Sequence, residues 1–215
     1  MKKNLFAAIV ACSALFAANA HAITVSLDDF NNGDQSLTAG AIGTLVSDTN
    51  AYRTLTTRLL STAPPTQSAV EVSFGGLHVT NGGGEDSEVT VSWNLAAGLL
   101  PPNATNIGFL FTIVQSDANA TDVEFLLNGA SVSNFAIPGN TFDKDLMFSV
   151  ADSVLDDGGT LTMVINGAVG WDLDLDFVGL SYDLPTRVNE VPEPASVALL
   201  GMGLLGLGAV RRRKA

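Results

Sequence analysis

The chain has 215 residues, of which 47% are apolar and 15% are charged, and its formal net charge at pH 7 is −12. This composition supports one globular domain with a sizeable core, because disordered chains combine high charge with few apolar residues. Residues 23–190 hold 21 acidic and 4 basic residues, a net charge of −17. A surface this negative repels phosphate, so nucleic acid is excluded as a partner.

The N-terminus has the pattern of a secretory signal peptide. Two lysines precede an apolar run, and small residues follow at Ala20 and Ala22. This order predicts export, with residues 1–22 removed by cleavage after Ala22. Lipidation at Cys12 is the alternative, but the apolar run before that residue is shorter than a signal peptide requires. Cys12 is the only cysteine, so the mature domain has neither a disulfide nor a thiol nucleophile.

The C-terminus has the pattern of a membrane segment. Residues 195–210 carry no charge and would span about 24 Å as a helix, slightly less than a hydrocarbon core of about 30 Å. Residues 211–215 form a basic tail, which the positive-inside rule keeps in the cytoplasm. We therefore expect a domain at 23–184 outside the inner membrane and a linker at 185–191. The chain would halt in that membrane transiently.

Residues 192–215 resemble the PEP-CTERM sorting signal of Gram-negative bacteria. A Pro-Glu-Pro motif, a segment rich in Gly, Leu and Ala, and a terminal arginine cluster occur in the order of that signal. The resemblance implies recognition by exosortase, a membrane cysteine peptidase, and delivery to the cell surface or extracellular matrix, in association with exopolysaccharide or biofilm. An unprocessed membrane anchor is the alternative. The residues that match the sorting signal are Pro192, Glu193, Pro194, Arg211, Arg212 and Arg213.

Residues 23–184 alternate repeatedly between apolar and polar side chains, which is the signature of half-buried strands. About ten short strands with Gly- and Asn-rich turns predict an all-β antiparallel sandwich, with a jelly roll preferred over a barrel. Residues 52–60 are ambiguous between helix and strand, but β-branched and aromatic residues favour a strand. Asn-Gly pairs at 81, 128 and 166 are the expected hairpin turns. Residues 103–110 recur as 119–126, which we interpret as two neighbouring strands.

The two ends of this domain resemble those of carbohydrate-binding or galactose-binding-like modules. The resemblance involves the segment 28–34 and the closing strand at 171–182. It implies a jelly-roll fold, whereas fold analogy alone does not establish a ligand. Trp93 and Trp171 lie in register with core positions, so we expect both to be buried rather than to stack on sugars.

The sequence offers little for catalysis. His78 is the only histidine outside the signal peptide, and the alternation around it places it on a solvent-facing strand position. A Ser-His-Asp site requires a rigid turn around the nucleophile, and no Gly-x-Ser-x-Gly motif is present. We therefore expect a protein without enzymatic activity. A glycosidase with two catalytic carboxylates stays an alternative, because the separation of carboxylates in space cannot be read from a sequence.

Calcium is the cofactor that the sequence favours most. Calcium binds six to eight oxygen ligands, which carboxylates and Asn side chains supply. One candidate cluster surrounds Gly33 in a loop, and the other lies on one face of the closing strand together with Asp176. Ordinary turn chemistry and a solvated acidic edge are the alternatives. The candidate ligands are Asp28, Asp29, Asn31, Asp34, Asp172 and Asp174.

Together these features predict an exported β-sandwich protein, sorted by exosortase, that acts without catalysis at the cell surface or in the polysaccharide matrix. A calcium-dependent carbohydrate-binding module is the first alternative. A secreted polysaccharide hydrolase is the second.

Overall fold

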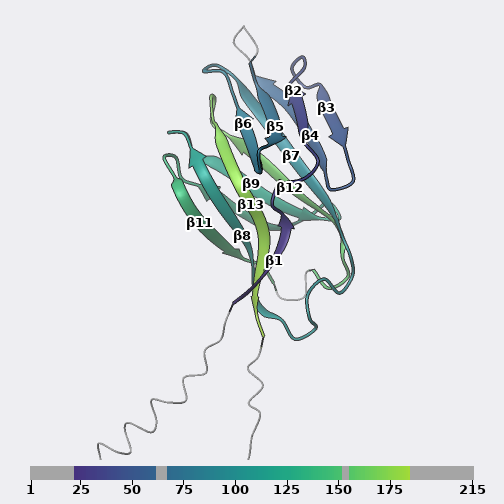
Figure 1. Cartoon of the computed structure of the whole chain (residues 1–215). Coiled ribbons are helices and arrows are strands. Elements are labelled where there is room, and N and C mark those ends of the chain that lie inside the picture. The colour runs from purple at the N-terminus through teal and green to yellow at the C-terminus, as the bar shows by residue number, and fades with distance from the viewer. Residues whose placement is uncertain (1–21, 62–66, 152–154, 185–215) are drawn as a thin grey trace, which may run out of the picture. The chain divides into compact units, whose positions relative to one another are not determined.

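The computed structural model describes residues 22–61, 67–151 and 155–184 (Figure 1). Within these ranges the secondary structure consists of β-strands. The strands are β1 (Ile23–Asp28), β2 (Gln35–Thr38), β3 (Leu45–Thr49), β4 (Thr54–Ser61), β5 (Ala69–Ser73), β6 (Gly76–Thr80), β7 (Asp86–Leu95), β8 (Thr105–Ser116), β9 (Thr121–Leu127), β10 (Ala130–Ile137), β11 (Phe142–Ser149), β12 (Gly159–Gly167) and β13 (Leu173–Asp183).

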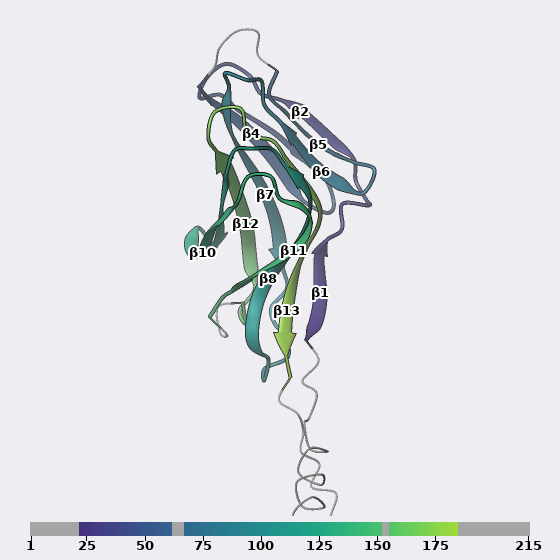
Figure 2. The same ribbon diagram turned by 90° about the vertical axis from the view of Figure 1, so that its left-hand side faces the viewer.

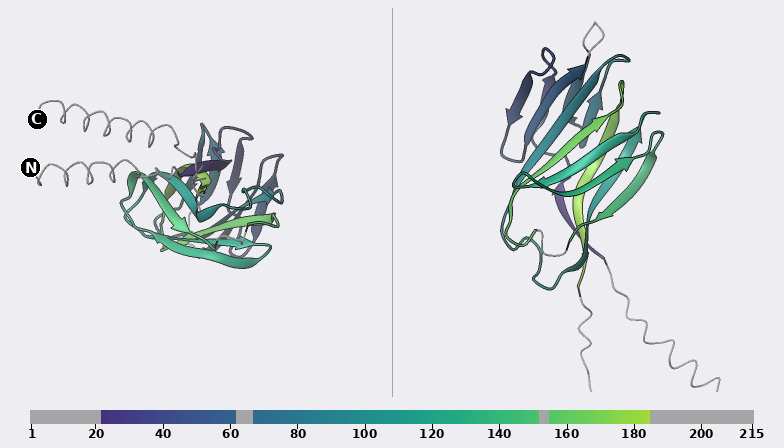
Figure 3. Two further views of the ribbon diagram at one scale, coloured as in Figure 1. Left: turned by 90° about the horizontal axis from the view of Figure 1, so that it is seen from below. Right: turned by 180° about the vertical axis from the view of Figure 1, so that it is seen from behind.

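Hydrogen bonding arranges the strands in two antiparallel sheets, which face each other in Figures 1 and 2. The first sheet has seven strands in the order β11-β8-β13-β6-β5-β2, with β1 paired to β13. The second sheet, seen from behind in Figure 3, has the order β10-β9-β12-β7-β4-β3. From β7 onward the chain passes repeatedly from one sheet to the other. The architecture confirms the predicted antiparallel sandwich with a jelly-roll-like course.

Strand β7 shows why alternating residues form this fold. Val89 and Val91 are fully buried and Trp93 is 4% exposed, whereas Thr90 and Ser92 between them are partly exposed. Successive side chains of a strand point to opposite faces, so one face of β7 joins the core and the other meets solvent. The burial of Trp93 and Trp171 confirms the prediction for both indoles.

Phenylalanines from both sheets form the centre of the core. The rings of Phe109 on β8 and Phe125 on β9 stack with their centroids 3.9 Å apart. These residues occupy equivalent positions in the two copies of the sequence repeat. The prediction that the copies form neighbouring strands is therefore wrong, because β8 and β9 lie in opposite sheets. The repeat instead supplies matching aromatic rings to the two walls of the core.

One of the three expected Asn-Gly hairpins is present. Asn128 and Gly129 have φ values of 51° and 82° and join β9 to β10 within the second sheet. This positive φ at both turn positions is what the two-residue type I′ turn requires. The pairs at 81 and 166 instead lie where the chain passes between the sheets.

Three strands were not predicted from the sequence, and each of them lies at the edge of a sheet: β2, β3 and β10. Strand β3 is mostly exposed, so it lacks the alternation that marks a half-buried strand. Residues 54–61 form strand β4, which settles the ambiguous segment in favour of a strand. It pairs with β7 on one side and with β3 on the other.

The first and last strands lie side by side. Strand β1 begins at Ile23, directly after the predicted signal cleavage position, and pairs with β13 so that Ile23 lies opposite Tyr182. The antiparallel pairing brings both ends of the described domain to one end of the sandwich (Figures 1 and 2). No helix within the described ranges is long and apolar enough to cross a membrane, and the predicted segment 195–210 lies outside them.

Candidate functional site

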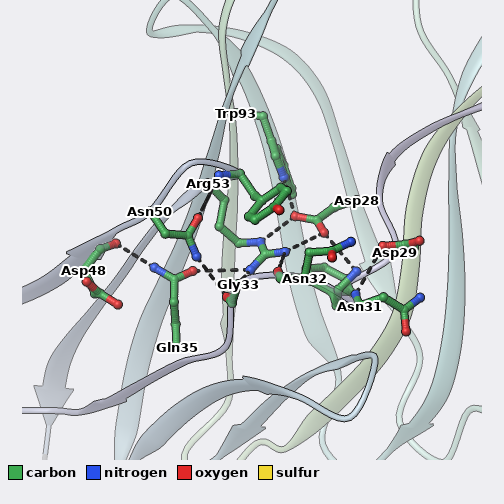
Figure 4. A network of polar contacts seen from close by, with 12 residues as sticks. Asp28, Asp29, Asn31, Asn32, Gly33, Gln35, Asp48, Asn50, Arg53 and Trp93 are labelled. Atoms are coloured by element: carbon green, nitrogen blue, oxygen red, sulfur yellow. Dashed lines mark hydrogen bonds and ion pairs between the residues drawn. The ribbon is translucent and has the colours of Figure 1, made fainter.

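The carboxylate of Asp28 lies in the interior, at the end of β1, and pairs with Arg53 (Figure 4). The two residues are 7% and 3% exposed. Arg53 donates from Nε to Oδ2 at 2.5 Å and from Nη2 to Oδ1 at 2.8 Å. This two-pronged geometry matches the planar guanidinium to the planar carboxylate, as in the strongest protein ion pairs.

The remaining hydrogens of the guanidinium hold the loop that follows β1. They are donated to the carbonyl oxygens of Asn32 and Gly33, each at 2.9 Å, and to Oε1 of Gln35 at 3.4 Å. Asp28 in turn accepts hydrogen bonds from Nε1 of Trp93 at 2.8 Å and from the N–H group of Phe30 at 2.9 Å. All donors of the arginine are therefore satisfied, which a buried charge requires.

This network changes the interpretation of the predicted calcium loop. Both oxygens of Asp28 are occupied by Arg53, and Asp28 points into the domain rather than toward a shared ion position. Hydrogen bonds from the side chain and backbone N–H of Asn31 lower the pKa of the exposed Asp29. Asp34 lies elsewhere, in a groove beside β2 and β5. The loop is thus held by an internal cation, the guanidinium, and its four candidate ligands do not converge.

We predict that Asp28→Asn lowers the free energy of unfolding by about 3–5 kcal/mol, because it leaves the guanidinium buried without its counter-charge. Denaturant unfolding measures the change. The control is Arg58→Met, which breaks an ion pair with Glu88 whose side chains are 39% and 24% exposed, and it should cost less than about 1 kcal/mol. Should Asp28→Asn not fold, Arg53→Lys gives a second test, since lysine restores the charge without the two-pronged contact. Equal midpoints for wild type and Asp28→Asn would contradict the assignment.

The second predicted cluster lies on the outer face of the first sheet, where one row of side chains crosses six strands. Register places the members of the row directly opposite one another on neighbouring strands. On β2, β5, β6 and β13 both chain neighbours of the row residue are buried, so the row itself faces solvent there. The pairs are Ser36 with Glu71, Glu71 with His78, His78 with Asp174, Asp174 with Gln115, and Gln115 with Phe142.

His78 occupies the middle of this row, which confirms its predicted outward position. Its Nδ1 atom lies 2.9 Å from Oδ1 of Asp174, and its Nε2 atom lies 3.2 Å from the backbone oxygen of Ser73. The imidazole is 39% exposed. Neither ring nitrogen contacts a hydroxyl group, so the histidine is not arranged as the base of a serine nucleophile.

A groove of about 280 Å³ continues the row toward β8 and β11. Asp117, Asp172 and Asp174 line it together with Gln115 and Phe142. Burial raises the pKa of Asp172, as do the nearby charges of Asp117 and Asp174, while the hydrogen bond from the backbone N–H of Asn81 acts in the opposite direction. The sequence missed Asp117, because this residue comes from the loop after β8.

The alternation of the closing strand ends at Asp176. The register between β13 and β8 shifts between Leu175 and Phe177, so Val178 instead of Phe177 enters the core. Asp172 and Asp174 share the groove, whereas Asp176 does not line it. Within the described part of the chain, no group of three or more His, Cys, Asp or Glu side chains is arranged to hold a metal ion. Calcium binding at Asp172 and Asp174 stays a prediction.

We predict that Asp172→Asn raises the thermal midpoint at pH 7 by a few degrees. The pKa of Asp172 is higher in the folded state than its ordinary value of 3.8, so its ionisation opposes folding at neutral pH. As the pH falls through 3.8 the carboxyl becomes protonated in the unfolded state as well as in the folded state, and the difference between the proteins should shrink toward zero. Thermal unfolding from pH 7 to pH 3 measures this, with Asp156→Asn on an exposed loop as the control. A lower midpoint for Asp172→Asn at pH 7 would contradict it.

The trafficking residues lie largely outside the described ranges. Ala22 is the first described residue and is exposed. Ala20, the linker at 185–191, the Pro-Glu-Pro motif and the arginine cluster lie outside, so the signal cleavage position and the domain boundaries stay predictions.

Comparisons with known proteins address both parts of the chain. A search of curated proteins finds no match. Among solved structures, a CBM4 carbohydrate-binding module is 19% identical, with a TM-score of 0.38 over 54% of this chain and 90% of that chain. A family 29 carbohydrate-binding module from Piromyces equi is 10% identical, with a TM-score of 0.35 over 75% of this chain and 98% of that chain.

A third similar structure is the family 11 carbohydrate-binding module of a cellulosomal cellulase of Clostridium thermocellum. It is 15% identical, with a TM-score of 0.35 over 74% of this chain and 94% of that chain. At these values no ligand is transferred from the three modules. The PEP-CTERM protein-sorting motif, by contrast, matches residues 190–214, which confirms the resemblance in the sequence. The chain therefore carries a PEP-CTERM sorting motif after a jelly-roll-like β-sandwich, which marks it as an exported protein that exosortase sorts to the cell surface.

Proposed function

We propose that this protein binds a neutral polysaccharide of the extracellular matrix along the outer face of its first sheet and does so without catalysis. Exosortase would remove the C-terminal segment and deliver the domain to the matrix of a Gram-negative cell. The observation that carries the proposal is the polar row from Ser36 to Gln115, which crosses the sheet without interruption.

The chemistry of this row suits a hydroxyl-rich ligand. It combines a hydroxyl, two carboxylates, an imidazole and an amide, which accept and donate hydrogen bonds in the manner that sugar hydroxyls require. Neighbouring strands lie about 4.8 Å apart, so a row across five strands extends over about 19 Å. A chain of linked sugars can meet such a row at several positions, whereas a small ligand would use only part of it.

Charge favours a neutral polymer over an acidic one. Residues 23–190 have a net charge of −17, and the groove contributes Asp117, Asp172 and Asp174. These carboxylates repel a uronate or sulfate group over the distance that salt leaves unscreened, about 8–10 Å.

Calcium-dependent binding is the second candidate. The observation in its favour is the raised pKa of Asp172, which neighbouring carboxylates help to produce and which a cation would offset. Calcium should then raise the thermal midpoint of EDTA-treated wild type and leave that of Asp172→Asn unchanged. Equal midpoints of the wild type with and without calcium would remove this candidate.

Binding can be tested with matched amide substitutions on the two outer faces. Gln115→Ala in the row should weaken binding to neutral polysaccharides by about tenfold, as expected for losing a central contact. Asn134→Ala on the second sheet, where Asn134 lines a groove with Glu88 and Asp122, should leave binding unchanged. Affinity electrophoresis against neutral and acidic polysaccharides measures both. No retention of the wild type by any polysaccharide, or equal effects of the two substitutions, would refute the proposal.

Sorting can be tested by mass. Material harvested from the culture should lack residues 1–22 and the arginine cluster Arg211–Arg213, because the Pro-Glu-Pro motif at 192–194 directs processing. Replacing Pro192 and Glu193 by alanine should leave the cluster attached and the protein in the membrane fraction. Intact-mass spectrometry reads both outcomes. A wild-type protein that keeps its arginine cluster after release would exclude exosortase processing.

A further inference from the structure

The turn between β5 and β6 presents a fully exposed phenylalanine. Phe74 has a relative exposure of 102%, and its φ is 51°. Ser73 pairs with Gly76 on either side of it, so Phe74 and Gly75 are the two central residues of a tight hairpin. Positive φ is uncommon outside glycine and is a genuine outlier for a bulky side chain.

The same chain contains a second turn with nearly the same backbone. Asn128 and Gly129 have φ values of 51° and 82°, and Phe74 and Gly75 have values of 51° and 80°. Asparagine tolerates this conformation through its short polar side chain, whereas phenylalanine does not. The β5–β6 turn thus holds a side chain that is costly both in backbone conformation and in exposed apolar surface. Asparagine at the other turn shows that the geometry does not require an aromatic residue.

The aromatic ring is presented on a rigid base. The added Cβ of any residue at Gly75 would lie 2.8 Å from Oδ1 of Asn31, so the turn packs against the loop that follows β1. That loop is fixed by Arg53 through the carbonyl oxygens of Asn32 and Gly33. A binding side chain held in this way loses little conformational freedom when a ligand covers it.

The residues around Phe74 indicate which kind of ligand fits against the exposed ring. A shallow groove of about 290 Å³ lies beside the ring, and Asp34, Ser36 and Glu71 supply its exposed oxygen atoms. A pyranose has an apolar C–H face that stacks on an aromatic ring, and it has hydroxyl groups at its edge that donate to carboxylates. Ser36 and Glu71 also begin the polar row across the first sheet. The groove is therefore continuous with the proposed binding face.

We propose that Phe74 is the stacking platform for one neutral sugar ring at the β2–β5 end of the polar row. The inference rests on the proposed polysaccharide binding and names the residue that would contribute most to its affinity. A cationic peptide is the competing occupant, because the ring and the carboxylates of Asp34 and Glu71 could attract a lysine or arginine. The shape of the row, which extends across five neighbouring strands, favours the linear sugar polymer.

The substitution Phe74→Asn provides the test. Phe74→Asn copies the Asn128 turn, so it should raise the thermal midpoint and weaken polysaccharide retention by about tenfold or more. Phe74→Trp keeps an aromatic face and should retain binding. Ile42→Ala is the control, because Ile42 is also an exposed apolar residue, at 58%, but lies outside the row; it should leave both binding and the thermal midpoint unchanged.

The outcomes separate this inference from the proposed function. If the wild type binds a polysaccharide and Phe74→Asn binds equally well, the platform is refuted while the binding face stands. If the wild type binds no polysaccharide, both the stacking platform and the proposed function are refuted. Retention that disappears as salt is raised from 50 mM to 500 mM would identify a charged occupant and overturn the assignment to a neutral sugar. A lower midpoint for Phe74→Asn would refute the strained turn on which the inference depends.

Discussion

The buried pair of Arg53 and Asp28 determines how the segment between β1 and β2 runs. Removing two charges from water costs several kcal/mol for each ion, and the cost is repaid only when geometry and further hydrogen bonds are complete. Here the guanidinium makes five hydrogen bonds, two to the carboxylate, two to the loop and one to Gln35 at the start of β2. A hydrophobic pair of similar volume could not fix the carbonyl groups of Asn32 and Gly33. The ion pair therefore specifies a loop conformation as well as filling a space in the core.

That loop connects the interior of the sandwich to its outer face. Asn31 packs against Gly75, and Gly75 and Phe74 form the tip of the β5–β6 hairpin. The same hairpin carries Glu71 and His78, which are paired across its strands. A displacement of the loop would thus change both the position of the exposed ring and the central part of the polar row. Stability of the core and precision of the candidate site depend on the same contacts.

Sequence patterns predicted the strands that bury one face and missed three edge strands, β2, β3 and β10. Strands β7 and β12 alternate clearly because one face of each packs on the core and the other meets solvent, whereas β3 is mostly exposed and buries little. The ion pair of Asp28 could not be read from the sequence for a different reason. The aspartates around Gly33 are local in sequence, but the partner of Asp28 is 25 positions away, and a single arginine in a polar segment gives no local signal. The polar row could not be read either, since its members come from strands that are distant in sequence. Phe74 was accessible in principle, because a Phe-Gly pair between two alternating runs is an unusual two-residue turn.

The two hairpins with nearly equal φ values illustrate how a domain of this kind can divide its residues between folding and recognition. At Asn128 the side chain tolerates the positive φ that the turn requires, so this residue serves the turn alone. At Phe74 the backbone requirement is the same, yet the side chain opposes it and projects into solvent beside Ser36 and Glu71. Proteins keep such locally unfavourable residues where activity requires them, and the remaining structure offsets the cost. In this sandwich the buried Arg53 network and the phenylalanine core stabilise the fold and so offset the cost of Phe74. A destabilising aromatic residue can therefore be held at a rigid and exposed position.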